Sequence, residues 1–337
     1  MSLTKYLKEV MQGKDLSYEV ACEVSTQLMQ SDLEAVQVAG LLAALKTKGE
    51  TYEEISGFAK GLKNHAVTIP TQKDGFYDIV GTGGDGADTF NISTTCAFVL
   101  SGSGLDIAKH GNRSVSSKCG SADVLEALGV NIEATADNIS IQLDEAGIAF
   151  IYAPLAHPSM KRVMPVRRQL GVPTIFNIIG PLANPVELSG QLVGVYKQEL
   201  VVDMAQSLIR LGVEKGAVVH GAGGLDEATL MGENTVLFIK NGGLKLQKIK
   251  GADYGLMMSE LADIRGGDAA FNAEIVRSVL KGEKGARRDT VLLNAGIAFY
   301  AFDRAVSIED GILMAAESID SGRAFEQLEK LVRISNR

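Results

Sequence analysis

Apolar residues in the first 68 positions of the chain recur at the spacing of one face of an α-helix. The clearest members of this stripe are Leu16, Val20, Val24, Leu28, Ile55, Phe58, Ala59 and Leu62. Two pairs match the capping box that begins a helix, Ser31 with Glu34 and Thr51 with Glu54. The pattern predicts a small bundle of about four helices.

After Pro70 and a polar segment, short apolar runs alternate with amphipathic segments. The runs predict strands near 77–80, 105–109, 148–152, 191–196 and 216–220, and a hairpin over 235–248 that turns on Asn241, Gly242 and Gly243. From position 270 to the end the helical pattern returns. Strands separated by helices form mostly parallel sheets covered on both faces. We therefore expect an α/β protein with a small helical N-terminal domain and a larger α/β domain.

The composition argues against a membrane-spanning protein, a secreted protein and a zinc protein. Hydrophobic residues make up 46% of the 337 positions, but no apolar run reaches the roughly 18 residues that cross a bilayer. The N-terminal segment carries charges throughout and does not match a secretory signal. The three cysteines are odd in number and far apart, which argues against a disulfide framework and a zinc site. We expect a soluble cytoplasmic protein without membrane contact.

The net charge of −8 disfavours nucleic acid as a partner, and no run of Lys or Arg exceeds two residues. An acidic chain that binds a polyphosphate needs cations to offset the repulsion. The charge therefore leads us to expect a metal ion if the chain handles phosphate.

A glycine-rich segment follows the first predicted strand, and a helix starts behind it. The segment runs Gly81, Thr82, Gly83, Gly84, Asp85, and the helix begins around Asn91, Ser93 and Thr94. Exposed amides and the positive end of a helix favour a bound phosphate. The segment lacks the Gly-Lys-Ser/Thr of a nucleoside-triphosphate loop and the third spaced glycine of a dinucleotide site.

A second candidate anion site follows the second predicted strand. Its thirteen residues from Lys109 to Ser121 include two lysines, Arg113, four serines and two glycines. Charged groups and hydroxyls together bind anions well. A solvated loop capped by Ser121 is the alternative.

Two further groups carry possible chemistry. Asp226 and Glu227 follow a buried strand, and adjacent carboxylates suit Mg²⁺, which shares its other ligands with water and phosphate; a solvated acidic turn is the alternative. His157 precedes Arg167 and Arg168, and an arginine beside an apolar pocket binds a carboxylate in two-pronged fashion.

These segments in their order resemble the anthranilate phosphoribosyltransferase family over nearly the whole chain. The matching motifs are GTGGD, NIST, KHGNR, SADVLEALG, the stretch from AHPSM to VRRQLG, GPLANP, GLDEAT and RRDTVLLNA. The resemblance implies a helical domain of residues 1–70 completed by helices from about 160–185, and an α/β domain of residues 71–159 and 186–337. It also implies a cleft between the domains and a homodimer formed through the helical domain.

The resemblance assigns substrates and residues to the site. The substrates are 5-phosphoribosyl pyrophosphate (PRPP) and anthranilate, and the cofactor is Mg²⁺. PRPP binding is implied for Gly81, Thr82, Gly83, Gly84, Asp85, Thr89, Asn91, Ser93, Thr94, Lys109 and Ser121. Anthranilate binding is implied for Gly81, His110, Asn112, His157 and Arg167, and metal binding for Ser93, Asp226 and Glu227. No residue is expected to act as a general acid or base.

Two other functions remain open from the sequence. A pyrimidine-nucleoside phosphorylase has the same split architecture and would use inorganic phosphate without the carboxylate pair. A nucleic-acid-binding relative that lost the transfer activity would need a basic surface, which the net charge of −8 disfavours.

Overall fold

The structure is a computed structural model that describes residues 3–30, 32–114, 117–240 and 242–337. Three residues used in the sequence predictions, Ser31, Ser116 and Asn241, lie outside these ranges.

Four helices occur in the described residues of the N-terminal part: α1 (Thr4–Met11), α2 (Tyr18–Gln30), α3 (Ala35–Lys48) and α4 (Tyr52–Lys63). The predicted capping box of α4 is confirmed, because Thr51 Oγ1 accepts from Glu54 N–H and Glu54 Oε2 accepts from Thr51 N–H. The earlier helix start predicted from Ser31 and Glu34 is wrong. Glu34 is extended, with φ −62° and ψ 124°, and α3 begins only after it.

A second group of short helices packs with this bundle. It comprises the 3₁₀ turns η2 (Pro158–Arg162), η3 (Ile175–Asn177) and η4 (Gly180–Ala183), and α9 (Met164–Leu170). The short helix α8 (Ala153–Ala156) precedes them, and its Ala156 packs in the separate cluster of β2 and β3. Val163, Val166 and Ile175 share one buried cluster with Leu41 and Phe58 of the bundle. Residues far apart in sequence therefore build a common apolar core at this end of the molecule.

Among the described residues, seven strands form one sheet in the order β3-β2-β1-β4-β5-β6-β7. Their bounds are β1 (Phe76–Gly81), β2 (Ile107–Gly111), β3 (Ile148–Tyr152), β4 (Leu188–Gly194), β5 (Lys215–His220), β6 (Glu233–Lys240) and β7 (Gly243–Lys250). The first five strands in this order pair in parallel, and β6 and β7 form the predicted antiparallel hairpin. The predicted mostly parallel sheet is confirmed.

The starts of β2 and β4 differ from the prediction. β2 starts at Ile107 rather than near 105, because Leu105 N–H bonds Leu100 O and closes the end of the preceding helix. β4 starts at Leu188 rather than near 191, because Leu188 is already paired with Phe76 of β1.

Helices cover both faces of the sheet. One face carries α5 (Ile92–Gly102), α6 (Ser121–Ala127), α11 (Ala269–Leu280), α12 (Ala286–Ala301), α13 (Ile308–Asp320) and α14 (Arg323–Ser335). The other face carries α10 (Leu200–Arg210), the N-terminal bundle, α7 (Ala136–Ile141) and the π-helical turn η1 (Gln142–Ala146). Alternate residues of β4 point to opposite sides, since Leu192 and Val193 belong to different buried clusters.

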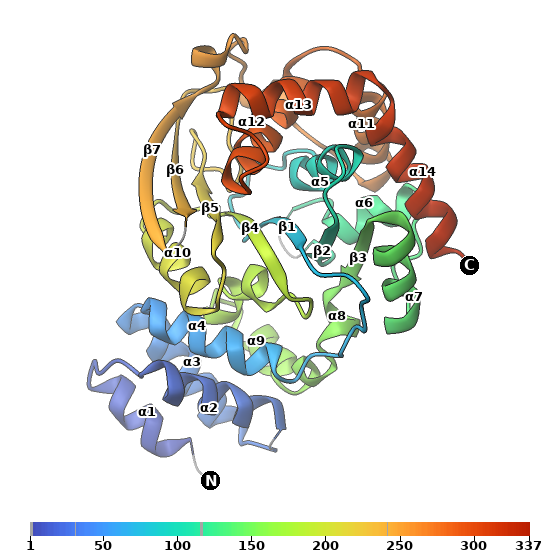
Figure 1. Cartoon of the computed structure of the whole chain (residues 1–337). Coiled ribbons are helices and arrows are strands. Elements are labelled where there is room, and N and C mark those ends of the chain that lie inside the picture. Colours follow the sequence, from blue (N-terminus) through green and yellow to red (C-terminus); the bar gives the residue numbers. More distant parts are fainter. Residues whose placement is uncertain (1–2, 31, 115–116, 241) are drawn as a thin grey trace.

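Figure 1 shows the blue helices α1–α4 at one end of the molecule and the red C-terminal helices at the opposite end, with the sheet between them. The remaining short elements, η5 (Gly251–Tyr254) and η6 (Leu261–Ile264), follow β7. Within the described residues, none of the helices combines the length and apolar character that crossing a bilayer requires.

Candidate active site

The candidate site lies at the edge of the sheet where the parallel strands β1, β2, β4 and β5 end. Open α/β sheets bind ligands at this edge, beyond the carboxyl ends of the strands. The glycine loop (residues 82–91) follows β1. The serine loop (residues 112–120) follows β2, and the acidic loop (residues 221–229) follows β5.

The glycine loop needs its glycines for two reasons. Gly83, Gly84 and Gly86 adopt φ of 68°, 86° and 69°, a region that side chains disfavour. Gly81, at the end of β1, lies against the acidic loop, because an added Cβ would stand 2.2 Å from Asp226 Oδ2. The glycines therefore shape the loop and let a carboxylate approach its backbone.

The acidic loop reaches the glycine loop and the start of α5 through its two carboxylates. Gly83 N–H donates to Asp226 Oδ2 at 2.6 Å, and Ser93 N–H donates to Glu227 Oε1 at 3.2 Å. Asn91 is the N-cap of α5 but makes no side-chain cap bond, so carboxylate oxygen from another loop takes one of the first amides of the helix. The structure thus brings together Ser93, Asp226 and Glu227.

The two carboxyl groups lie in an environment that disfavours their charge. Burial, together with repulsion from Asp85, raises the pKa of Asp226 to about 7. Burial and repulsion from Asp226 raise the pKa of Glu227 to about 8, although Lys109 acts in the opposite direction. A cation held by both groups would stabilise their charged forms.

Lys109 lies beneath the first turn of α5 and is only 4% exposed. Its ammonium donates to Ile79 O at 2.7 Å and to Ser93 Oγ at 3.4 Å. Burial lowers the pKa of Lys109, while attraction by Asp78 and Glu227 acts to raise it. The side chain therefore places a positive group between β1 and the first turn of α5.

The predicted threonines have different surroundings. Thr82 N–H continues the sheet contact by donating to Gly194 O at 2.9 Å. Thr89 pairs with Arg265 in an isolated antiparallel bridge. Thr94 Oγ1 is buried in the first turn of α5 and has no hydrogen-bond partner in the described part of the chain.

The serine loop is held by acids of the helix that follows it. Asp123 Oδ2 accepts from Ser114 N–H at 3.0 Å and from Gly120 N–H at 2.9 Å. Arg113 forms ion pairs of 2.8 Å with Asp123 and with Glu126. Arg113, predicted as a donor to an anion, is therefore already paired with carboxylates of α6. The sequence reasoning missed Asp123, although an acid three residues after Gly120 is a recognisable capping signal.

A chain of amides joins the serine loop to the glycine loop. Asn91 Nδ2 donates to Cys119 O at 3.2 Å, and Asn272 Nδ2 from α11 donates to Asn91 Oδ1 at 2.9 Å. Ser121, the first residue of α6, donates to Asn112 O at 3.3 Å. Asn272 was not predicted, since nothing in its local sequence connects it to either loop.

His110 and His157 form an edge-to-face pair with ring centroids 5.2 Å apart. Both rings are 4% exposed. Burial lowers the pKa of His110 to about 3 and that of His157 to about 4, so both rings are neutral at pH 7. Within the described residues, His110 Nε2 and both ring nitrogens of His157 lack hydrogen-bond partners. The pair therefore offers unused polar atoms.

Arg167 lies on α9, half-buried, with its guanidinium 5.4 Å from the centre of the Phe176 ring. It donates to Asn177 Oδ1 at 3.4 Å and to Met164 Sδ at 3.5 Å, and burial lowers its pKa. In the described part of the chain no carboxylate pairs with it and no hydrogen bond joins it to the three loops. Arg168, the next residue, is exposed.

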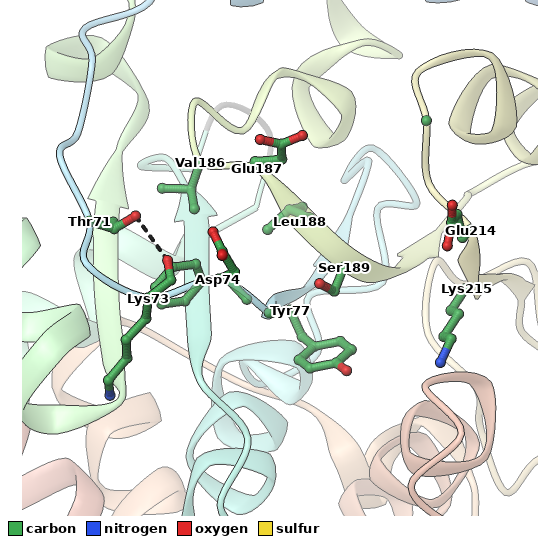
Figure 2. A pocket seen from close by; sticks show the side chains of 13 residues that line it. Thr71, Lys73, Asp74, Tyr77, Val186, Glu187, Leu188, Ser189, Glu214 and Lys215 are labelled. Atoms are coloured by element: carbon green, nitrogen blue, oxygen red, sulfur yellow. Dashed lines mark hydrogen bonds between the residues drawn. The ribbon is translucent and has the colours of Figure 1, made fainter.

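A separate cleft of about 600 Å³ lies at the opposite edge of the sheet, where β1, β4 and β5 begin. Figure 2 shows its side chains, among them Lys73, Glu187 and Glu214. Lys73 is paired with Asp106 at 3.3 Å. The cleft contains none of the predicted site residues.

Comparison with known proteins identifies the family. Residues 73–325 match the family described as "Glycosyl transferase family, a/b domain", and residues 4–66 match its "helical bundle domain". An anthranilate phosphoribosyltransferase from Bacillus cereus (strain AH820) is 48% identical over 334 residues, covering 99% of this chain and 98% of the relative. The chain belongs to the anthranilate phosphoribosyltransferase family.

Solved structures of anthranilate phosphoribosyltransferases agree with this family assignment. The enzyme from Thermus thermophilus has a TM-score of 0.93 and 39% identity, with 100% of both chains covered. The enzyme from Saccharomyces cerevisiae in complex with PRPP and Mg has a TM-score of 0.91 and 29% identity, covering 99% of this chain and 98% of the other. The resemblance and the fold class predicted from the sequence are confirmed.

Proposed function

We propose that this chain transfers the 5-phosphoribosyl group of PRPP to the amino group of anthranilate, giving N-(5-phosphoribosyl)anthranilate and pyrophosphate in tryptophan biosynthesis. The observation that carries this proposal is the meeting of the glycine and acidic loops at the start of α5, where Gly83 and Ser93 amides bond Asp226 and Glu227. The amides and the buried lysine are suited to a diphosphate, and the carboxylate pair is suited to its metal ion. Both parts of a site for a metal-bound diphosphate therefore lie together.

The diphosphate of PRPP would lie against the glycine loop and the first turn of α5. The residues proposed to bind it are Gly81, Thr82, Gly83, Gly84, Asp85, Thr89, Asn91, Ser93, Thr94, Lys109 and Ser121. Lys109 supports this role because its ammonium already stands within 3.4 Å of Ser93 Oγ. Thr94 supports it because its buried hydroxyl has no partner in the described residues.

The residues present fit Mg²⁺. Asp226 and Glu227 are hard oxygen donors; burial raises their pKa values, and a bound cation would stabilise their charged forms. No three His, Cys, Asp or Glu side chains of the described residues gather closely enough to hold a metal alone. Ser93, water and diphosphate oxygens would therefore complete the ligand set. When bound, Mg²⁺ neutralises the negative charge that develops on the departing diphosphate.

Anthranilate would bind beside His110 and His157. We assign its contacts to Gly81, His110, Asn112, His157 and Arg167. The neutral rings of His110 and His157 supply polar atoms without repelling the amine, and Arg167 has no carboxylate partner among the described residues. A guanidinium without a carboxylate partner in the described residues is suited to bind the carboxylate of anthranilate.

The chemistry needs no general base from the protein. The aniline nitrogen is neutral at pH 7 and forms a bond to the anomeric carbon as the bond from that carbon to the diphosphate oxygen breaks. The acidic proton on the newly substituted nitrogen is then lost to water or to the released diphosphate. The glycine-loop amides and Lys109 hold the leaving group, and the acceptor residues orient the amine. The chain's contribution is therefore orientation and stabilisation of the leaving group.

The same proposal includes the organisation of the enzyme. We divide the chain into a helical domain of residues 1–70 completed by about 160–185, and an α/β domain of residues 71–159 and 186–337. Closure of the cleft between them would exclude water that hydrolyses PRPP. We propose a cytoplasmic homodimer formed through the helical domain.

The experiment is a fluorescence assay, because anthranilate is fluorescent. Its signal should decay only when PRPP and Mg²⁺ are both present. Supplying inorganic phosphate with a pyrimidine nucleoside, and following nucleoside cleavage by ultraviolet absorbance, tests the phosphorylase alternative. Cleavage of the nucleoside, with anthranilate unchanged, would overturn the proposed function in favour of that alternative.

A further inference from the structure

The motif RRDTVLLNA lies on α12, and none of its residues has a role in the site described above. Its Asn294 is fully buried and reaches the acidic loop, 66 positions away in sequence. Asn294 Oδ1 accepts from Ala228 N–H at 2.9 Å, and its Nδ2 donates to Ala228 O at 2.7 Å. One amide thus satisfies both backbone groups of the residue that follows Glu227.

A second buried asparagine closes the same loop from the other side. Asn234 Oδ1, on β6, accepts from Ala222 N–H at 3.0 Å and from Thr229 N–H at 2.8 Å. Its Nδ2 donates to Thr229 O at 2.9 Å. The two ends of the acidic loop are therefore tied together, and Asn294 holds the part of the loop beside the carboxylates.

The loop also has little room to shift. A Cβ on Gly194 would stand 1.5 Å from Asp226 O, and a Cβ on Gly221 would stand 1.8 Å from Glu227 O. Backbone contact on this side and the Asn294 amide on the other confine Asp226 and Glu227 between them. Two like charges in one place would otherwise separate toward water.

We propose that Asn294 is a positioning residue for the transfer reaction: its amide fixes the backbone at Ala228 and so directs Glu227 toward the start of α5, where the metal-bound diphosphate is held. This inference rests on the proposed function. Asn294 touches neither substrate in this account and acts through the acidic loop alone.

Only an amide of this length provides both bonds. Leucine is close in size to asparagine but leaves the Ala228 N–H and C=O without partners, and such groups cost free energy when buried. Alanine leaves the same groups free but opens space that water fills. Both changes should release the acidic loop while keeping the apolar packing of α12 largely intact.

The test compares Asn294→Leu and Asn294→Ala with a matched control, Ser25→Ala. Ser25 is equally buried and donates to Phe58 O at 2.8 Å, but it belongs to the N-terminal helices. PRPP binding is measured by calorimetry with and without Mg²⁺ and without anthranilate. Urea unfolding establishes that each variant folds, and the smaller alanine change carries the test if the leucine variant does not fold.

We expect the Kd for PRPP in the presence of Mg²⁺ to rise roughly 10- to 100-fold in the Asn294 variants, as for other residues that orient a metal ligand. The KM for anthranilate should change less than twofold, and Ser25→Ala should bind PRPP as the parent does. Unchanged Mg²⁺-dependent binding in folded Asn294 variants, or equal loss for both substrates, would overturn the inference. If the parent enzyme itself consumes no anthranilate with PRPP, the proposed function fails instead.

Discussion

Asn184 donates a hydrogen bond of 3.1 Å from its Nδ2 to the Asp78 carboxylate, across 106 positions of sequence. The same Nδ2 donates to Ala108 O at 2.8 Å. Gln191 Nε2 reaches the same Asp78 oxygen at 3.4 Å and Pro181 O at 2.7 Å. The chain returns to the sheet at Asn184, so this buried polar group fastens the returning segment to β1 and β2 directly beneath the site.

Asn184→Ala should lower the free energy of unfolding by about 2 to 3 kcal/mol, because the Asp78 carboxylate loses a donor in a buried place. Burial already raises the pKa of Asp78 to about 6, so the charged form of this carboxyl group is disfavoured even with its donors in place. Urea denaturation measures the change. Asn336→Ala is the control, since its exposed amide also bonds a carbonyl, Gly129 O at 2.9 Å, and should cost about 0.5 kcal/mol or less. Equal losses in both variants would contradict this account.

The local features of the fold were predictable because each depends on neighbouring residues. The stripe from Leu16 to Leu28 and the capping box at Thr51 gave helices, and the run before Gly81 gave β1. The start of α3 at Ala35 was not predicted, because the backbone of Glu34 is extended where the capping pattern required a helix.

Part of the candidate site was also predictable, since strand ends of a parallel sheet meet at one edge. The meeting of Ser93 with Glu227 follows from that rule. The pairing of Arg113 with Glu126 and the bond from Ala228 to Asn294 do not, because they depend on how a loop packs against a helix. Such contacts join residues whose local sequences carry no shared pattern.

Asp226→Asn combined with Glu227→Gln should abolish the metal requirement together with the rate. The amides remain close in size to the carboxyl groups but lose the negative charge that holds Mg²⁺. Initial rates are measured over a Mg²⁺ titration at fixed PRPP and anthranilate. Turnover that still depends on Mg²⁺ would place the cation elsewhere in the chain.

Gly194→Ala should displace the acidic loop, because the added Cβ would overlap Asp226 O, 1.5 Å from its ideal position. Misplacement of reacting groups by about 1 Å costs about 100-fold in rate. We therefore expect kcat/KM for PRPP to fall by about that factor. Gly40→Ala is the control, since its Cβ would meet only the Leu7 side chain, Cδ2 at 3.4 Å and Cδ1 at 3.7 Å. A Gly194 variant as active as the Gly40 variant would contradict the packing described for the loop.

The buried histidine pair predicts how stability depends on pH. The pKa of His110 is lowered from 6.5 to about 3 and that of His157 to about 4, in both cases first by burial. The unfolded chain therefore takes up protons below pH 6.5 while the folded rings stay neutral, so folding stability is fully present above pH 6.5 and falls as the pH is lowered toward 3 to 4.

Each histidine in this state should cost about 1.4 kcal/mol for each pH unit in that window. Unfolding free energies of the parent and of His157→Asn, measured by urea at pH 7 and pH 5.5, should show a smaller pH-dependent loss in the variant, by about 1 kcal/mol. A loss of the same size in both proteins would show that the ring does not resist protonation in the folded state.

Arg167→Ala should weaken the use of anthranilate more than the binding of PRPP. The Arg167 guanidinium has only Asn177 Oδ1 and Met164 Sδ as hydrogen-bond partners in the described residues, so its charge is available to a carboxylate. Arg168→Ala is the matched control, because the neighbouring side chain has the same chemistry but is exposed.

We expect the KM for anthranilate to rise roughly tenfold or more in the Arg167 variant only, in line with a lost charge-assisted bond. Steady-state kinetics with each substrate varied in turn separate the two effects, and the Kd for PRPP should stay within twofold of the parent. An equal loss for both substrates would reassign Arg167 to the packing of α9, and a larger effect from Arg168→Ala would move the carboxylate contact to that residue.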